Sequence, residues 1–164
     1  MCWIGKPGDK RVAGRNITVY KVLNVTMSEN GMEYEAPYRK GFQYVMGKKY
    51  KVRSFGMNQS TPYLYIDRGL HCYSQNAYVA ALNFGGYISV YSGNNKDPRP
   101  VDHKCMAVFQ RTTMPPVVVK CTIPKGATYY KNERGEIVTN SLILNENLGT
   151  PDSNKIIRFK DLYK

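Results

Sequence analysis

The apolar runs of this chain are short, and glycine, proline or asparagine ends almost every one of them. Valine, isoleucine, tyrosine and threonine dominate these runs, and such residues favour a pleated, half-buried surface. No run approaches the roughly 18 residues that a membrane-spanning helix needs, so we expect no membrane partner. We predict one domain, residues 1–164, of β-rich α+β class: a mostly antiparallel sheet, as a partly closed barrel or sandwich.

Turn residues mark two hairpins. Strands at 17–27 and 32–38 flank Asn30-Gly31, a strong two-residue turn signal because both positions of a type I′ turn need a positive φ. Residues 119–144, VKCTIPKGATYYKNERGEIVTNSLIL, hold two apolar runs with two turns between them, and predict strands at 116–123, 128–132 and 136–144. The other predicted elements are strands at 48–55, 62–69, 70–74, 87–93 and 104–112, a last strand or helical turn at 155–163, and one short helix near 74–84, where Ser74 can cap.

Charge and tyrosine content are the main anomalies of the composition. The 24 Lys and Arg residues exceed the 12 Asp and Glu residues, for a net charge of +12, and there are 14 tyrosines. Cations attract anions, and tyrosines offer flat faces with a hydroxyl at the rim. The pattern favours nucleotides, nucleic acid or an acidic protein surface, but scattered solubilising lysines and half-buried strand tyrosines explain it equally well.

The cysteines and histidines carry no metal-site spacing. The chain has Cys2, Cys72, Cys105 and Cys121 without a C-x-x-C pair, and His71 lies far from His103. We expect no metal and no cofactor. Reduced, buried thiols in a cytoplasmic protein are the favoured interpretation; disulfides in a secreted protein are the alternative, but the N-terminus MCWIGKPGDK has no signal-peptide pattern.

Catalytic signatures are weak. His71 and Cys72 are adjacent on a predicted strand, so their side chains point to opposite faces and the histidine cannot easily activate the thiol. Phosphate-binding glycine loops are absent. Glu136, which follows the Gly135 turn and opens a strand, is the one candidate catalytic carboxylate, and capping of that turn is the more favoured role. We therefore expect a protein that is more readily a binder than an enzyme.

Three separated blocks, MCWIGK, GLHCYS and CTIPKGATYYKNERGEIVTN, resemble an uncharacterised family of bacteriophage and gut-bacterial proteins. The resemblance implies a phage protein located in the cytoplasm of a bacterial host cell, and with it a role in sequestering a defence signal of that host. A weaker analogy links the late hairpin to the ADP-ribosyltransferase fold, with Glu136 as its acidic residue and Lys21 or His71 as its early basic residue. The chain has no S-T-S triplet, so this link is an analogy alone.

The leading hypothesis is a non-enzymatic binding protein for a small phosphorylated ligand, a nucleotide or a cyclic oligonucleotide signal. The alternatives are a nucleic-acid-binding protein, an ADP-ribosyltransferase-like enzyme using Glu136, and a structural or interaction protein of a phage. A homo-oligomer is compatible with each. The predicted ligand-binding residues are Lys125, Tyr129 and Tyr130 on one wall, Arg53, His71 and Tyr73 on the other, and Lys21 and Trp3 beside them.

Overall fold

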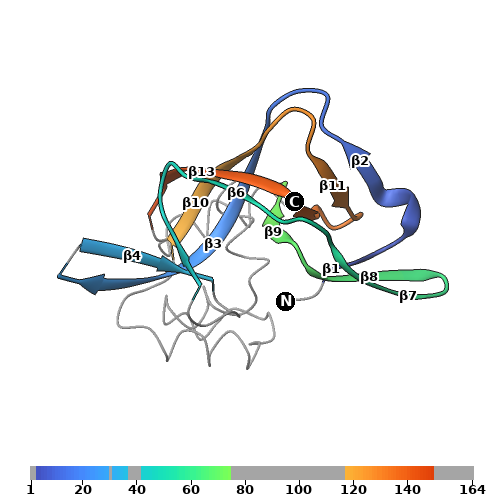
Figure 1. The fold of residues 1–164 in the computed structure, drawn as a ribbon, viewed down its shortest axis with the longest axis horizontal. Helices are drawn as coiled ribbons and strands as arrows, with labels where there is room; N and C mark the ends of the chain where they lie inside the picture. Colours follow the sequence, from blue (N-terminus) through green and yellow to red (C-terminus); the bar gives the residue numbers. More distant parts are fainter. Residues whose placement is uncertain (1–2, 30, 37–41, 75–116, 150–164) are drawn as a thin grey trace, which may run out of the picture.

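A computed structural model describes residues 3–29, 31–36, 42–74 and 117–149 of the chain (Figure 1). These ranges hold strands β1 to β13 and one 3-10 turn, Pro7–Asp9, and every strand pairing is antiparallel. The prediction of a β-rich antiparallel fold is confirmed. The α+β class is not, because that turn is the one helical element of the described ranges. The helix predicted near 74–84 lies, beyond Ser74, outside the described residues, as do the strands predicted at 87–93, 104–112 and 155–163.

The larger sheet has ten strands, in the order β2-β11-β12-β9-β3-β10-β13-β6, with β4 paired to β3 and β5 to β4. A smaller sheet has three strands in the order β1-β8-β7. The larger sheet consists of β2 (Lys10–Val12), β3 (Ile17–Ser28), β4 (Gly31–Glu35), β5 (Gln43–Tyr44), β6 (Lys49–Lys51), β9 (Leu70–Tyr73), β10 (Val117–Ile123), β11 (Thr128–Lys131), β12 (Glu136–Thr139) and β13 (Ser141–Asn147). The smaller consists of β1 (Trp3–Gly5), β7 (Gly56–Ser60) and β8 (Tyr63–Arg68).

The long strand β3 organises the larger sheet. Its first half pairs with β10 from Ile17 onward, and its second half pairs with β4 as far as Ser28 opposite Gly31. The predicted hairpin is therefore confirmed, but residues 29–30 connect its strands, one position earlier than predicted. Gly31 has a φ of 102°, a conformation that glycine adopts without steric cost.

The segment 119–144 forms nested pairs. Its outer runs pair as β10 with β13, and its inner runs pair as β11 with β12. The single strand predicted at 136–144 is broken at Asn140, because this residue bonds across to β11: its N–H donates to the carbonyl oxygen of Thr128 (3.0 Å), and its Oδ1 accepts from the N–H of Thr128 (3.0 Å). After this break the chain leaves β11 and pairs with β10.

Two hydrophobic clusters lie on opposite faces of the larger sheet. The main cluster collects side chains from strands near both ends of the strand order, including Ile137 of β12 and Leu142 of β13, so the sheet curls around this inner face. It is not a closed barrel, because β2 and β6, at the two ends of the order, do not pair. The second cluster, on the outer face, holds the smaller sheet against β11 and β12; its buried members are Trp3, Leu64, Ile66, Tyr130 and Val138.

Candidate anion-binding face

Tyr129 and Tyr130 do not share a wall. Tyr129 packs against the main cluster on the inner face, whereas Tyr130 belongs to the second cluster on the outer face and is 4% exposed. Adjacent strand residues point to opposite sides, which separates the pair. The ring of Trp3 is 1% exposed and lies 5.6 Å from the ring of Tyr130, so neither ring is open to a ligand.

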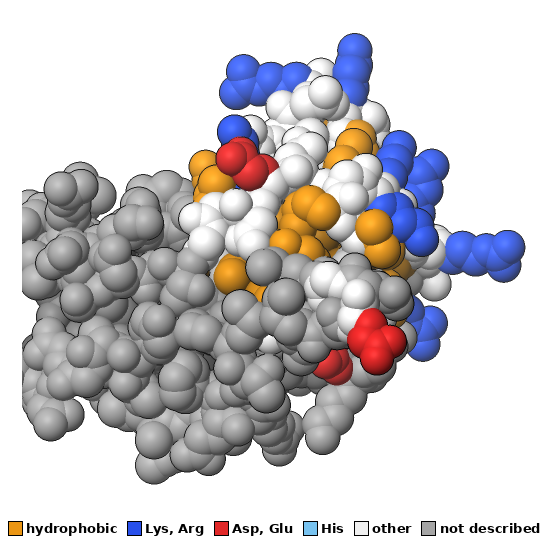
Figure 2. All heavy atoms as spheres, turned by 90° about the vertical axis from the view of Figure 1, so that its left-hand side faces the viewer, with side chains coloured by type: hydrophobic (Ala, Val, Ile, Leu, Met, Phe, Trp, Pro, Cys, Tyr) orange, Lys and Arg blue, Asp and Glu red, His pale blue; other side chains and the backbone are white. Residues whose placement is uncertain are grey.

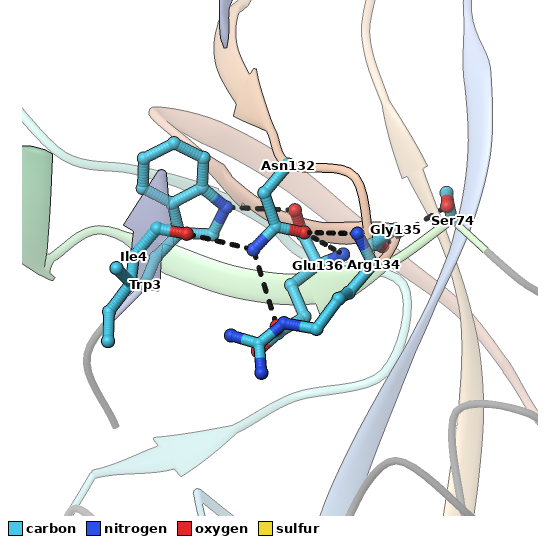
Figure 3. A network of polar contacts seen from close by, with 7 residues as sticks. All are labelled: Trp3, Ile4, Ser74, Asn132, Arg134, Gly135 and Glu136. Atoms are coloured by element: carbon cyan, nitrogen blue, oxygen red, sulfur yellow. Dashed lines mark hydrogen bonds and ion pairs between the residues drawn. The ribbon is translucent and has the colours of Figure 1, made fainter. Parts of the chain in front are cut away.

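Glu136 stabilises a turn (Figure 3). Its carboxylate Oε1 lies 2.8 Å from Nε of Arg134 and accepts a 3.3 Å hydrogen bond from Nδ2 of Asn132. Its carbonyl oxygen accepts the indole N–H of Trp3 at 2.8 Å, and its own N–H donates to Oδ1 of Asn132 at 3.0 Å. The residue thus links β12 to β1 and to its own turn, but its carboxylate contacts side chains and, among the described residues, no backbone N–H. The backbone donors of the turn bond to Oδ1 of Asn132 instead, so Asn132 fills the capping role that the sequence favoured for Glu136.

Lys21 and His71 are neighbours, Lys21 buried and His71 partly exposed. Lys21 is on the inner face, 7% exposed; its Nζ donates a 2.7 Å hydrogen bond to the carbonyl oxygen of His71 and lies 5.3 Å from the ring centroid of Tyr44. Burial, together with the Lys21 ammonium, lowers the pKa of His71 to about 4. Tyr73, on the same strand, is 4% exposed. These three residues form part of the packed sheet.

Arg53 and Lys125 are exposed and belong to different connections. Arg53 lies between β6 and β7, and Lys125 lies in the turn between β10 and β11, where its N–H donates to Oδ1 of Asn16 at 2.9 Å. The two walls that the sequence predicted are thus not assembled among the described residues. Their members divide between both faces of the sheet, its interior and separate turns.

The structure instead gathers cations and hydroxyls on the outer face of β3, β10, β13 and β6. Cross-strand partners form a row from Thr18 through Thr122 and Ile143 to Lys49. Lys120 lies two positions from Thr122 on the same face, opposite Tyr20, and Lys51 lies two positions from Lys49. We call these residues the outer basic face: Thr18, Tyr20, Lys49, Lys51, Lys120 and Thr122.

The cations of the outer basic face have no partner within the described ranges. Lys49, Lys51 and Lys120 are exposed, and no ion pair or hydrogen bond engages their ammonium groups in that part of the chain. Glu146, opposite Lys120 on β13, is the acidic residue nearest to them in the strand register. Figure 2 shows Lys and Arg side chains projecting outward from the described part of the molecule. Exposed cations on neighbouring strands, without a partner in the described ranges, suit an extended anion.

The sequence-based prediction missed the outer basic face, although the alternation of polar and apolar residues in two of its strands indicates an exposed side. In VVVKCTI, Lys120 and Thr122 alternate with buried residues, which marks an exposed side of β10. The stretch KYK of β6 repeats the pattern, with Tyr50 against the main cluster and lysines on the other side. The strand order could not be predicted from the sequence, and it is this order that places β10 and β6 on either side of β13.

Among the described residues no group of three or more His, Cys, Asp or Glu side chains is arranged to hold a metal ion. None of their helices has the length and apolar character that crossing a membrane requires. No protein-family model matches the chain, and neither a curated protein nor a solved structure matches it. Fold and site therefore define an antiparallel β protein with a basic sheet face, without placing it in a family.

Proposed function

We propose that this chain is a non-enzymatic binding protein for a phosphate-bearing partner, which it holds on the outer basic face. The observation that carries the proposal is the set of three exposed lysines, Lys49, Lys51 and Lys120, with no ion pair in the described part of the chain. An ammonium without a carboxylate partner is available to bind an external anion, and charge-assisted hydrogen bonds to phosphate are strong.

The neighbouring groups support the same chemistry. Thr18 and Thr122 face each other across β3 and β10 within the lysine-bearing surface. The Thr122 hydroxyl donates to Oδ1 of Asn145 at 2.7 Å, so Thr18 is the one of the two that can donate to a phosphate oxygen. Side chains two positions apart on a strand, such as Lys49 and Lys51, lie about 7 Å from each other. Rigid strands hold the backbone spacing, so the ordering cost of binding is limited to the lysine side chains.

The reactive groups of the described residues favour binding over catalysis. The carboxylate of Glu136 already has Arg134 and Asn132 as partners. Burial raises the pKa of the Cys121 thiol to about 12 and that of Cys72 further, so neither supplies a thiolate nucleophile near neutral pH. A nucleotide or a cyclic oligonucleotide signal, as the sequence suggested, falls within the proposed class of partner.

A binding panel tests this proposal. The probes are a fluorescent ATP analogue, a labelled cyclic dinucleotide, a labelled 12-mer oligonucleotide and inorganic polyphosphate, with poly-glutamate as an acidic polymer lacking phosphate. The variant Lys49→Gln/Lys51→Gln/Lys120→Gln removes the three cations. Its matched control, Lys6→Gln/Lys10→Gln/Arg68→Gln, removes the same charge from exposed positions on other elements.

We expect binding of at least one phosphate-bearing probe, a loss of at least tenfold in the first triple variant, and a loss below threefold in the control. Affinity should fall as salt rises, since binding releases counterions. Equal losses in the two variants would show a response to net charge alone. No phosphate-bearing probe binding more tightly than about 1 mM, or poly-glutamate binding as well as they do, would reject the proposal.

A further inference from the structure

We infer that the phosphate-bearing partner is a single-stranded nucleic acid, one base of which stacks on Tyr20. The inference rests on the proposed function and adds the class of polymer. It starts from a row of cross-strand partners on the outer face that runs from Tyr73 of β9 through Tyr20 of β3 to Lys120 of β10. The row places an aromatic ring directly beside an unpaired cation.

Tyr20 differs from Tyr73 and from the tyrosines that pack around Phe42, because it is neither fully buried nor in contact with another ring in the described ranges. Tyr73 is 4% exposed, and Tyr44 and Tyr50 pack edge to face with Phe42 and with each other at centroid distances from 4.9 to 5.9 Å. Tyr20 is half-buried, and within the described ranges no hydrogen bond or ring contact engages its side chain. Part of the Tyr20 side chain is therefore exposed, next to the exposed Lys120.

A partly exposed ring on a rigid sheet is a stacking platform for an unpaired base. Stacking on aromatic side chains and neutralisation of the backbone by Lys and Arg are the two terms of single-strand binding. Lys120 is the cross-strand neighbour of Tyr20, and Lys49 lies two strands from Lys120, a lateral separation of about 10 Å. A nucleotide stacked on Tyr20 therefore has cations along the path of its phosphates.

A duplex does not fit this arrangement, because paired bases are stacked on one another and present no free face. A bare polyanion would use the lysines but gain nothing from the ring. Glu146, exposed opposite Lys120, repels any phosphate at that end of the row. A single strand, a duplex and a bare polyanion should therefore respond differently to substitutions at Tyr20.

Fluorescence anisotropy distinguishes the binding of a single strand, a duplex and a bare polyanion. The probes are a fluorescein-labelled 12-mer of thymidine, a 12-base-pair duplex and inorganic polyphosphate as competitor, each at several salt concentrations. The variants are Tyr20→Ala, Tyr20→Phe and, as a matched control, Tyr63→Ala, which removes an exposed tyrosine from the hairpin of the smaller sheet. Circular dichroism and thermal melting verify that each variant is folded.

Tyr20→Ala should weaken binding of the 12-mer by about 5- to 100-fold, the range for loss of one stacked base. Tyr20→Phe, which keeps the ring, should bind within about threefold of the parent, as should Tyr63→Ala. Glu146→Gln should strengthen binding. Polyphosphate competition and the salt dependence should depend on the three lysines and not on Tyr20.

Two outcomes would overturn the inference. The first is unchanged affinity for the 12-mer in folded Tyr20→Ala and Tyr20→Phe, and the second is duplex binding as tight as single-strand binding. If phosphate probes still bind in a lysine-dependent way, either outcome leaves the proposed function intact. Failure of every phosphate probe would instead reject the proposed function as well. If Tyr20→Ala does not fold, Tyr20→Phe and Tyr20→Leu decide, since only leucine should lose affinity for the 12-mer.

Discussion

The ammonium of Lys21 donates a 2.7 Å hydrogen bond to the carbonyl oxygen of His71, in a position where the sheet ladder is incomplete. β3 and β9 pair at one position, Tyr20 opposite Tyr73, and then separate. The lysine side chain satisfies an acceptor that a longer ladder would have paired with a backbone N–H. A cation is thereby buried on the inner face of the sheet, against the strand that carries His71.

Acid should destabilise the fold through His71. Its pKa is about 4 in the folded chain against 6.5 ordinarily, chiefly because burial disfavours the charged ring. Between these values the unfolded chain binds more protons, so stability present above pH 6.5 is lost as pH falls toward 4, by about 3 kcal/mol for this group. Urea unfolding at several pH values measures it. In His71→Gln the loss across this window should be smaller, and a curve parallel to that of the parent would contradict the assignment.

Removing the neighbouring cation should raise the pKa of His71. In Lys21→Met the repulsion between ammonium and imidazolium disappears, while burial remains, so the value should rise but stay below 6.5. Titration of the ring protons by NMR reports it, with His103→Gln used to assign the two histidines. An unchanged or lower pKa in a folded Lys21→Met variant would show that the ammonium does not act on the ring.

Cys72 and Cys121 should stay reduced and unreactive in the native protein. Both are buried, at 1% and 0% exposure. They lie on β9 and β10 with β3 between and are also offset along the strands, so their Cα atoms are more than about 9.5 Å apart, beyond the span of a disulfide. In a Cys2→Ser/Cys105→Ser background, Ellman's reagent should label neither thiol until urea unfolds the chain. Rapid labelling of the native state, or a disulfide between them in mass spectrometry, would refute this.

Asn132 should be the most sensitive residue of the turn before β12. Its side chain donates to the carbonyl oxygen of Ile4 (3.0 Å) and accepts from the N–H groups of Arg134 (3.1 Å) and Glu136 (3.0 Å). Asn132→Ala removes these bonds and should cost about 1 to 3 kcal/mol of unfolding free energy. Glu133→Ala, at an exposed position of the same turn, is the control and should change stability by less than about 0.5 kcal/mol. Equal effects would mean that the network carries no stability.

Gly69 should not tolerate a methyl group. A Cβ added there would lie 2.3 Å from Cγ2 of Val138 and 3.2 Å from the ring of Phe55, at the contact between the two sheets. Gly69→Ala should therefore destabilise the protein by about 1 to 3 kcal/mol. Gly14→Ala, where an added Cβ meets nothing within 4 Å, should be neutral or slightly stabilising. Thermal melting compares the two, and a Gly69→Ala variant as stable as Gly14→Ala would contradict the packing.

Local pattern predicted much of the fold but little of the site. The alternation in ITVYKVLNV and the turn signals near Gly31 and Gly135 predicted the β3–β4 and β11–β12 hairpins, because period and turn chemistry are local properties. β1, β2 and β7 were missed: KRV of β2 is exposed at every position and MNQS of β7 is polar, so neither shows a hydrophobic period. These strands exist because their partners offer a free edge.

By itself, the amino-acid sequence determined that this protein is β-rich and mostly antiparallel, with excess positive charge, since strand propensity and composition need no long-range information. Only the tertiary structure decided which cations share a surface. Each strand sends adjacent residues to opposite faces, so Tyr129 and Tyr130 separate, whereas Lys49 and Lys120, distant in sequence, reach one face through the β6–β13–β10 pairing. That pairing depends on the burial of residues such as Leu142 and Leu144, and no local stretch of sequence encodes it.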